Sequence, residues 1–129
     1  MVSTLESTTS AIQLKEDSLL AQASDKDFVY RRVHPDDFYK GFPDVLEGLT
    51  PVGTNTKQLL VNRYNELFPR LADIYKIFVI EDVQKNRIIG AGSVVIERKF
   101  IRSLGLVGHM EDVVVEKSYR GKNLGGRLI

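Results

Sequence analysis

The chain has 129 residues, of which 43% are hydrophobic and 27% charged, a balance typical of one globular domain. Its net charge of +1 gives no overall attraction to nucleic acid or to an anionic membrane surface. The absence of cysteine excludes disulfides and thiolate metal sites, and with only two histidines we expect no metal site at all.

Residues 1–26 are rich in Ser, Thr, Gln and acidic side chains, which offer little apolar surface to offset the entropy cost of ordering. We predict a mobile extension there and a folded domain over 27–129. The extension lacks the basic start and apolar core of a secretory signal. No apolar run approaches the roughly 20 residues of a membrane-spanning helix. We therefore expect a cytoplasmic protein without an integral membrane segment.

The first half of the domain predicts one strand and three helical pieces. "FVYRRV" (28–33) is rich in aromatic and β-branched residues, which favour a strand. The helical segment that follows is interrupted by Gly41 and Pro43, so we expect two short pieces. After the loop "TPVGTNT", candidate caps at Thr54–Thr56 precede the clearest helix. Its apolar residues recur at helical spacing: Leu60, Tyr64, Leu67, Phe68 and Leu71.

The second half predicts three strands, at 75–82, 87–99 and 106–117, separated by the turns "VQKN" and "FIRSLG". The order strand, broken helix, helix, then three strands is typical of an α+β domain with a mixed, mainly antiparallel sheet.

The last eleven residues, "YRGKNLGGRLI", place basic side chains and three glycines between a strand and the start of a helix. Glycines let the main chain approach a ligand, and successive N–H groups at a helix N-terminus attract an anion such as a phosphate. On these residues alone, a flexible basic turn remains the alternative. A nucleotide loop fits poorly, because Arg127 and Leu128 stand where Lys and Ser or Thr are required.

This stretch resembles the acetyl-CoA signature of the GNAT superfamily of N-acetyltransferases: Arg or Gln, two residues, Gly, one residue, then Gly or Ala. The match runs from Arg120 to Gly125, with Asn123 in place of the middle glycine. Asn tolerates the left-handed conformation better than most residues. The segments "LTPVGT", "SVVIERKFIRSLGLVGHMEDVVV" and "YRGKNLG", in this order, narrow the resemblance to the glucosamine 6-phosphate N-acetyltransferases, from about Tyr30 to Ile129.

The resemblance implies that acetyl-CoA lies along the third of these strands. Main-chain groups of Val113, Val114 and Val115 would pair with its pantetheine arm as another strand would. The N–H near Val113 would polarise the thioester carbonyl, which is a catalytic role. The residues implied in the pyrophosphate cradle are Arg120, Gly121, Lys122, Asn123, Leu124, Gly125 and Gly126.

The resemblance also implies a sugar site. Its implied residues are Thr50, Lys99, Phe100, Ile101, Arg102, Glu111 and Asp112. Lys99 and Arg102 would meet the sugar phosphate. Glu111 also carries a catalytic role, although we do not assign it as the sole base.

Glu111 and Asp112 are neighbours, and neighbours on a regular strand face opposite sides of a sheet. Both reach one site only if the strand bulges, and Gly108 would permit such a distortion. From spacing alone, a surface pair with one member in a salt bridge is the alternative. On a regular strand His109 faces away from Asp112, and we interpret it as structural.

The implied reaction is direct transfer of an acetyl group from acetyl-CoA to the amine of glucosamine 6-phosphate, in UDP-N-acetylglucosamine biosynthesis, by a homodimer. The family's fold continues past the glycine loop, so we expect a C-terminally incomplete domain with little activity alone and weak acetyl-CoA binding. Two alternatives stay open: a short chain that pairs with complete subunits and lowers their activity, and a GNAT enzyme for another amine.

Overall fold

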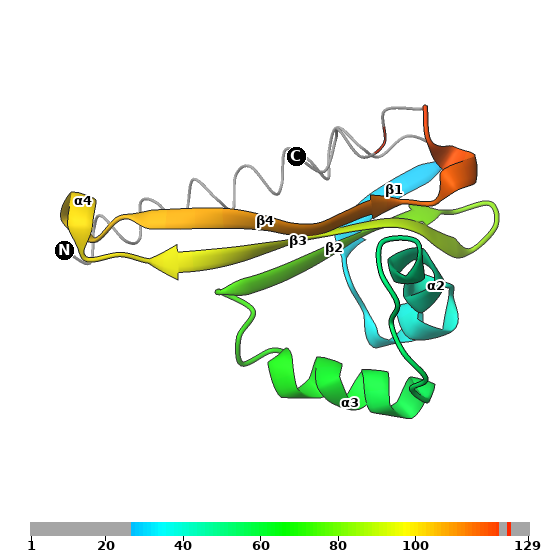
Figure 1. The fold of residues 1–129 in the computed structure, drawn as a ribbon, viewed down its shortest axis with the longest axis horizontal. Helices are drawn as coiled ribbons and strands as arrows, with labels where there is room; N and C mark the ends of the chain where they lie inside the picture. The colour runs from blue at the N-terminus through cyan, green and yellow to red at the C-terminus, as the bar shows by residue number, and fades with distance from the viewer. Residues whose placement is uncertain (1–26, 122–123, 125–129) are drawn as a thin grey trace.

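Four strands form an antiparallel sheet in the order β1-β2-β3-β4, and two of the helices, α2 and α3, lie on one of its faces (Figure 1). The computed structural model describes residues 27–121 and Leu124. The elements are β1 (Phe28–Arg32), η1 (Pro35–Tyr39), α2 (Phe42–Glu47), α3 (Lys57–Leu67), β2 (Tyr75–Asp82), β3 (Arg87–Arg98), α4 (Ile101–Leu104), β4 (Leu106–Val115) and η2 (Lys117–Tyr119). The predicted α+β class is confirmed. The proposed extension at 1–26 lies outside the described residues.

The connection from β1 into the helices depends on one buried carboxylate. Asp37 is 0% exposed. It accepts hydrogen bonds from Arg31 Nη1 at 2.8 Å and Nη2 at 2.7 Å, and from the His34 N–H at 2.7 Å. A buried charge is costly unless it is paired in this way. The predicted break in the helix is confirmed at Gly41, whose φ of 97° separates η1 from α2.

Among the described residues α3 is the longest helix; it begins at a side-chain cap and ends just before a proline. Thr56 Oγ1 accepts the Leu59 N–H at 3.2 Å, which confirms a predicted cap. The helix ends at Leu67, earlier than the apolar spacing suggested, because the residue before Pro69 is driven out of helical geometry. None of its residues is fully buried, so α3 packs loosely over the sheet.

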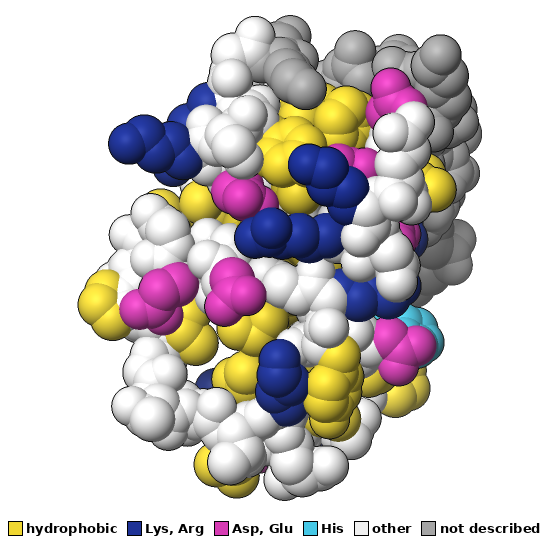
Figure 2. All heavy atoms as spheres, turned by 90° about the vertical axis from the view of Figure 1, so that its right-hand side faces the viewer, with side chains coloured by type: hydrophobic (Ala, Val, Ile, Leu, Met, Phe, Trp, Pro, Cys, Tyr) yellow, Lys and Arg dark blue, Asp and Glu magenta, His cyan; other side chains and the backbone are white. Residues whose placement is uncertain are grey.

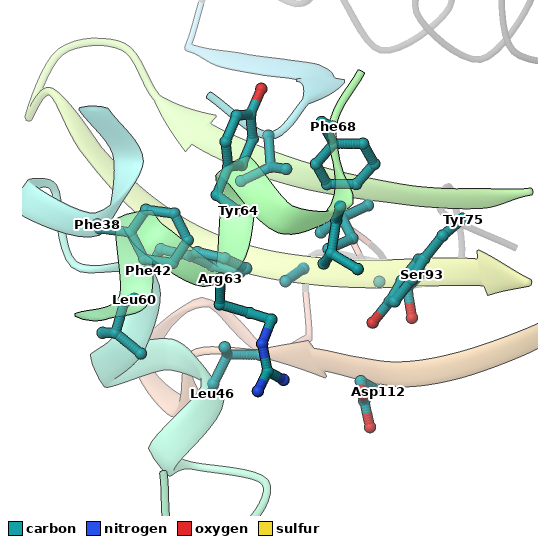
Figure 3. Close-up of a pocket in the computed structure, with 15 residues that line it drawn as sticks. Phe38, Phe42, Leu46, Leu60, Arg63, Tyr64, Phe68, Tyr75, Ser93 and Asp112 are labelled. Carbon is teal, nitrogen blue, oxygen red and sulfur yellow. The ribbon is translucent and has the colours of Figure 1, made fainter. Parts of the chain in front are cut away.

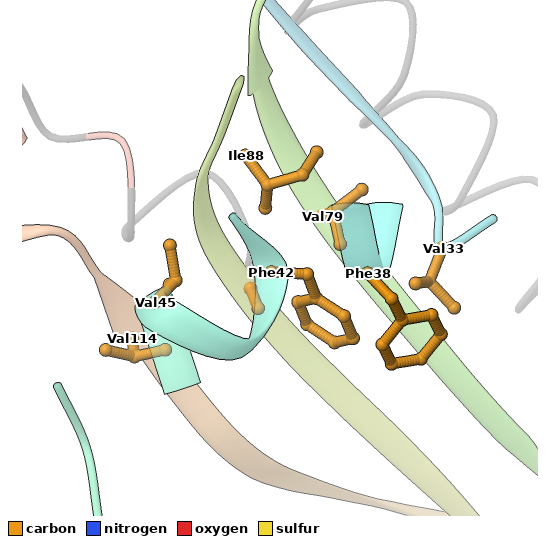
Figure 4. Close-up of a cluster of buried hydrophobic side chains, with 8 residues drawn as sticks. Val33, Phe38, Phe42, Val45, Val79, Ile88 and Val114 are labelled. Atoms are coloured by element: carbon orange, nitrogen blue, oxygen red, sulfur yellow. The ribbon is translucent and has the colours of Figure 1, made fainter. Parts of the chain in front are cut away.

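Side chains on the two faces of the sheet form two separate cores. The core between the sheet and the helices (Figure 4) consists of Val33, Phe38, Phe42, Val45, Val79, Ile88, Ala91 and Val114. The core on the opposite face consists of Tyr30, Ile80, Ile89, Tyr119 and Leu124. Burial of these side chains, at about 25 cal/mol per Å² of apolar surface, is the main source of stability.

The β3–β4 hairpin extends past the end of β2 and carries α4 at its tip (Figure 1). Within α4, Arg102 and Ser103 have φ values of 54° and 56°, so this short piece is a left-handed turn rather than a regular helix. Across residues 27–121 and Leu124, every helix is too short or too polar to cross a bilayer.

Candidate active site

The strand β4 contains a bulge at Asp112. Ala91 pairs with Val114 and Ser93 pairs with Glu111, so two residues of β4, Asp112 and Val113, oppose Gly92. Asp112 adopts the left-handed φ of 51°. A bulge is therefore present, as the acidic pair required, but it does not lie at Gly108, which pairs regularly with Ile96.

The bulge brings both carboxylates to the face that carries the helices. Glu111 is opposite Ser93, and directly paired residues share a face. Asp112 lines a cavity on that face together with Ser93. His109 is opposite Val95, so the same shift places it on this face too, and not away from Asp112 as on a regular strand.

His109 is paired with a carboxylate of the neighbouring strand. Its Nε2 lies 3.0 Å from Glu97 Oε1, and both side chains are about half exposed. This hydrogen bond, with a second from Lys99, holds the pKa of Glu97 below its ordinary value. The contact supports the structural interpretation of His109, because its ring nitrogen is engaged away from the acidic pair.

A cavity of about 260 Å³ lies between α3 and the sheet, on the face of the acidic pair (Figure 3). Apolar and aromatic side chains form most of its wall: Val33, Phe38, Phe42, Leu46, Leu60, Tyr64, Leu67, Phe68, Ile77 and Ala91. The polar side chains that line it are Arg63, Tyr75, Ser93 and Asp112. A polar ligand would therefore bind at the part that these four residues border.

Three of these polar residues were not predicted from the sequence. Ser93 Oγ donates to the Glu111 carbonyl at 3.1 Å, which ties β3 to the bulge. Burial raises the pKa of Tyr75, Asp112 raises it further, and Glu111 adds a smaller increase, whereas Ser93 and Arg63 lower it. Tyr75 starts β2, and the pairing of the strands brings it near Asp112, whereas Arg63 reaches the cavity because α3 packs over the sheet.

The main chain of β4 presents an edge beside the bulge. The Glu116 N–H donates to the Ile89 carbonyl at 2.8 Å. Main-chain groups alternate in direction along an antiparallel ladder. Counting from this bond, the N–H and C=O of Val114 point toward β3, and those of Val113 and Val115 point outward. Among the described residues no strand pairs with that outer edge. The outward groups of Val113 and Val115 can therefore pair with an extended ligand.

The glycine-rich loop is fixed to the sheet by two tyrosines. Tyr119 Oη donates to Asp82 Oδ2 at 2.6 Å, and Tyr30 Oη donates to the Leu124 carbonyl at 2.6 Å. The side chain of Leu124 is buried, so it offers a ligand only its main chain. Gly121 has a φ of 92° with open space around its Cα. The remaining predicted loop residues, Lys122, Asn123, Gly125 and Gly126, lie outside the described residues.

Basic side chains gather at the end of the sheet next to this loop (Figure 2). A hollow of about 390 Å³ is lined by Arg87, Lys117 and Arg120 among others, and also by Asp44 and Glu116. Arg120 Nε donates to the Val115 carbonyl at 3.0 Å, which occupies one of the outward main-chain groups. The cations favour a phosphate here, although the two acids reduce the net charge.

The predicted sugar residues do not all meet in one place. Thr50 is exposed, and its N–H donates at 3.1 Å to the carbonyl of Leu46, which lines the cavity. The segment Lys99–Arg102 lies beyond the far end of β4, and Asp112 follows Leu106 by six positions, or about 20 Å at 3.3 Å per residue. Phe100 is 91% exposed and Ile101 63%.

The described residues contain no group of three or more His, Asp or Glu side chains placed to hold a metal ion.

Comparison with known proteins assigns the family. A family model described as "Acetyltransferase (GNAT) family" matches residues 42–129, which include α2, the whole bulged hairpin and the glycine-rich loop. The chain belongs to the GNAT acetyltransferase family. Within this GNAT fold, the sequence resemblance had identified the acidic pair at the bulge of β4 and the glycine-rich loop after it.

Two relatives of this GNAT chain carry the same enzyme name. Glucosamine 6-phosphate N-acetyltransferase 1 of Dictyostelium discoideum is 44% identical over 100 residues, which cover 78% of this chain and 62% of that protein. The Arabidopsis thaliana glucosamine 6-phosphate N-acetyltransferase is 39% identical over 102 residues, 79% of this chain and 68% of the relative. This chain therefore spans about two thirds of the length of these two relatives.

Solved structures agree with the fold. The crystal structure of the Arabidopsis thaliana glucosamine-6-phosphate N-acetyltransferase matches with a TM-score of 0.71 and 41% identity, over 76% of this chain and 66% of that one. An acetyltransferase of Trypanosoma brucei matches with a TM-score of 0.69 and 33% identity, over 79% of this chain and 69% of that one.

Proposed function

We propose that the protein transfers the acetyl group of acetyl-CoA to the amine of glucosamine 6-phosphate. The observation that carries this proposal is the bulge at Asp112, which brings Glu111 to the face of the sheet where Asp112 lines a cavity, beside the open main-chain edge at Val113. The names of the relatives support the choice of amine and acyl donor. The product, N-acetylglucosamine 6-phosphate, would serve the synthesis of UDP-N-acetylglucosamine.

The acyl donor fits the edge of β4 and the glycine-rich loop. The outward groups of Val113 and the N–H of Val115 would pair with the amide groups of the pantetheine arm, as in strand addition. The open backbone at Gly121 and the basic side chains of Arg120 and Arg87 suit the negative charge of the pyrophosphate. The bulge lies next to Val113, so it would place the acidic pair near the thioester end of the donor.

In the reaction the free amine attacks the thioester carbonyl, a C–N bond forms, and the C–S bond breaks to release CoA. The Val113 N–H would stabilise the negative charge that builds on the carbonyl oxygen. Glu111 and Asp112 would bind the sugar and orient the amine, whose proton leaves to water or to a carboxylate. Orientation and charge stabilisation would supply most of the acceleration, because no covalent enzyme intermediate is needed.

We also propose that the protein acts as a homodimer in the cytoplasm. The hairpin tip exposes Phe100, Ile101 and Val107, an unusual concentration of apolar surface at one place, and a second subunit would cover it. A second subunit would also give the distant Lys99–Arg102 segment a role at a site.

Calorimetry and a steady-state assay test this function. We expect the protein to bind acetyl-CoA weakly and to acetylate glucosamine 6-phosphate slowly. Asp112→Asn should raise KM for the sugar about 10-fold or more, the loss expected for a charged hydrogen bond, and leave acetyl-CoA binding unchanged. Asp73→Asn is the matched control, because Asp73 is exposed and does not line the cavity. Absence of heat with acetyl-CoA would contradict the proposal.

A further inference from the structure

The bulge that carries the proposed function has an unfavourable backbone conformation at its central residue. Asp112 adopts a φ of 51°, in the left-handed region that is uncommon for residues other than glycine. It is opposite Gly92, which has no side chain to pack against it. Neighbouring groups must therefore hold Asp112 in this conformation.

Ser93 makes a direct contact with the bulge from the neighbouring strand. Its hydroxyl donates to the Glu111 carbonyl at 3.1 Å. This carbonyl belongs to the peptide unit that joins Glu111 to Asp112, and a peptide unit is planar. The hydrogen bond therefore fixes the plane from which the backbone of Asp112 rotates, and with it the direction of the Asp112 carboxylate.

The Ser93 hydroxyl also lies at the polar border of the cavity. Ser93 is only 3% exposed, so solvent reaches its hydroxyl through the cavity that it lines. Figure 3 shows this hydroxyl close to that of Tyr75. Burial is the largest cause that raises the pKa of Tyr75, the charge of Asp112 raises it further, and Ser93 lowers it. Three strands thus contribute one polar side chain each to the same part of the cavity.

Strand pairing on the other side of the bulge does not depend on this contact. Val114 pairs with Ala91, directly after Val113. This pairing holds the open edge at Val113 whether or not the Ser93 hydroxyl is present. Loss of the hydroxyl should therefore disturb the carboxylate of Asp112 more than the edge that would bind acetyl-CoA.

We propose that Ser93 is a positioning residue for the acetyl transfer. Its hydrogen bond to the Glu111 carbonyl keeps the Asp112 carboxylate directed toward the amino sugar in the cavity. The inference rests on the function proposed above, and it adds a residue that acts on the sugar through Asp112 and does not touch the reacting atoms.

Steady-state kinetics with both substrates tests this role. We expect Ser93→Ala to raise KM for glucosamine 6-phosphate about 3- to 10-fold, as for the loss of one hydrogen bond, and to change KM for acetyl-CoA less than about 2-fold. A purely structural loss would lower the amount of folded enzyme, which lowers the apparent kcat and leaves both KM values unchanged. Ser93→Thr keeps the hydroxyl, so it should restore KM for the sugar to within about 2-fold of the wild-type value.

A double-mutant cycle with Asp112→Asn separates positioning from direct contact with the sugar. If Ser93 acts through Asp112, the double variant should have a KM for the sugar no more than about 2-fold above that of Asp112→Asn alone. If Ser93 contacted the sugar independently, the two increases in KM would multiply. That result would overturn the positioning role.

Ile88→Val is the matched control, because Ile88 is buried on the same strand and does not line the cavity. It should lower the melting temperature and leave both KM values unchanged. If Ser93→Ala behaves in the same way, the role of Ser93 is overturned while the proposed function stands. If the wild-type protein does not acetylate glucosamine 6-phosphate, the proposed function fails, and the role of Ser93 fails with it.

Discussion

At the scale of single residues, buried polar side chains hold the strands to the connections between them. Asp82 is buried at the end of β2, and it accepts the Tyr119 hydroxyl from the segment after β4. This hydrogen bond is the largest cause that lowers the pKa of Asp82 and raises that of Tyr119. A carboxylate thus fixes the start of the glycine-rich loop against the sheet.

The effect of pH on stability follows from these directions. The pKa of Asp82 is lower in the folded state, so its contribution is present above the unfolded value near 4 and is lost as pH falls through the folded value. We expect Tyr119→Phe to lower the free energy of unfolding by about 1.5–3 kcal/mol at pH 7, and by less at pH 3 or below. Urea unfolding at both pH values measures this.

The control for that prediction is Tyr39→Phe, because Tyr39 is 60% exposed and its ring packs under Lys57. It should change stability by less than about 0.5 kcal/mol at either pH. An equal loss for Tyr119→Phe at pH 7 and at pH 3 would show that the Asp82 charge is not involved.

Some residues of the site can be predicted from the sequence, and others cannot. Glu111 and Asp112 stand out because adjacent acids interrupt an apolar strand, and the family resemblance gives them a role. Arg63, Tyr75 and Ser93 have no such signal. A tyrosine at the start of a strand and an arginine on an amphipathic helix are ordinary surface or packing residues until the helix is placed over the sheet.

At the scale of elements, the order of strands and helices could be predicted, and the position of the bulge could not. Alternation and turn residues indicate each strand, and Gly41 with Pro43 indicates the broken helix. Gly108 was the expected place of the distortion because glycine tolerates it. The distortion falls at Asp112 instead, opposite Gly92, since the location depends on how two strands pair and not on one strand's flexibility.

Gly90 of β3 lies against the core with no room for a side chain. A Cβ added at Gly90 would lie 2.6 Å from Cδ1 and 3.3 Å from Cβ of Ile80, which is fully buried. We expect Gly90→Ala to lower the free energy of unfolding by about 1–3 kcal/mol, because the core must shift to admit a methyl group. Chemical unfolding in urea measures the loss.

Gly108→Ala on β4 is the matched control. A Cβ added at Gly108 would be 3.3 Å from Cγ1 of the half-buried Val94. Because Gly108 is exposed, a small shift of the Val94 side chain relieves the contact. Its cost should be well below that of Gly90→Ala. A larger loss at Gly108 than at Gly90 would contradict this account of the core.

At the scale of the whole molecule, the hairpin tip lies apart from α2 and α3 (Figure 1), and none of its residues lines the cavity. In the sequence Arg102 precedes Glu111 by only nine positions, which suggested that Lys99–Arg102 and the acidic pair belong to one site. Strands are extended, however, so the strand residues between the two groups hold them far apart in space. This separation could not be predicted from motifs, which give neighbours along the chain and not across space.

The exposed apolar tip gives the proposed dimer a test. Phe100 is 91% exposed, and its burial by a second subunit would contribute about 1.5–3 kcal/mol. We expect Phe100→Asp to convert a dimer to a monomer at micromolar concentration in sedimentation velocity. Leu59→Asp, on the exposed side of α3, should leave the dimer unchanged. A wild-type protein that sediments as a monomer, or a Phe100→Asp variant that remains dimeric, would contradict this assignment.

The bulge also absorbs one extra residue of β4, so its position tolerates a change of length that the rest of the hairpin does not. Deleting Asp112 would leave Val113 alone opposite Gly92 and Glu111 still opposite Ser93, so Glu111 and His109 would stay on the face of α3. Deleting Met110 instead would shift His109 by one pairing position and turn it, with every residue up to the hairpin tip, to the opposite face. Outside the bulge we therefore expect insertions and deletions in β4 to be tolerated far less than substitutions.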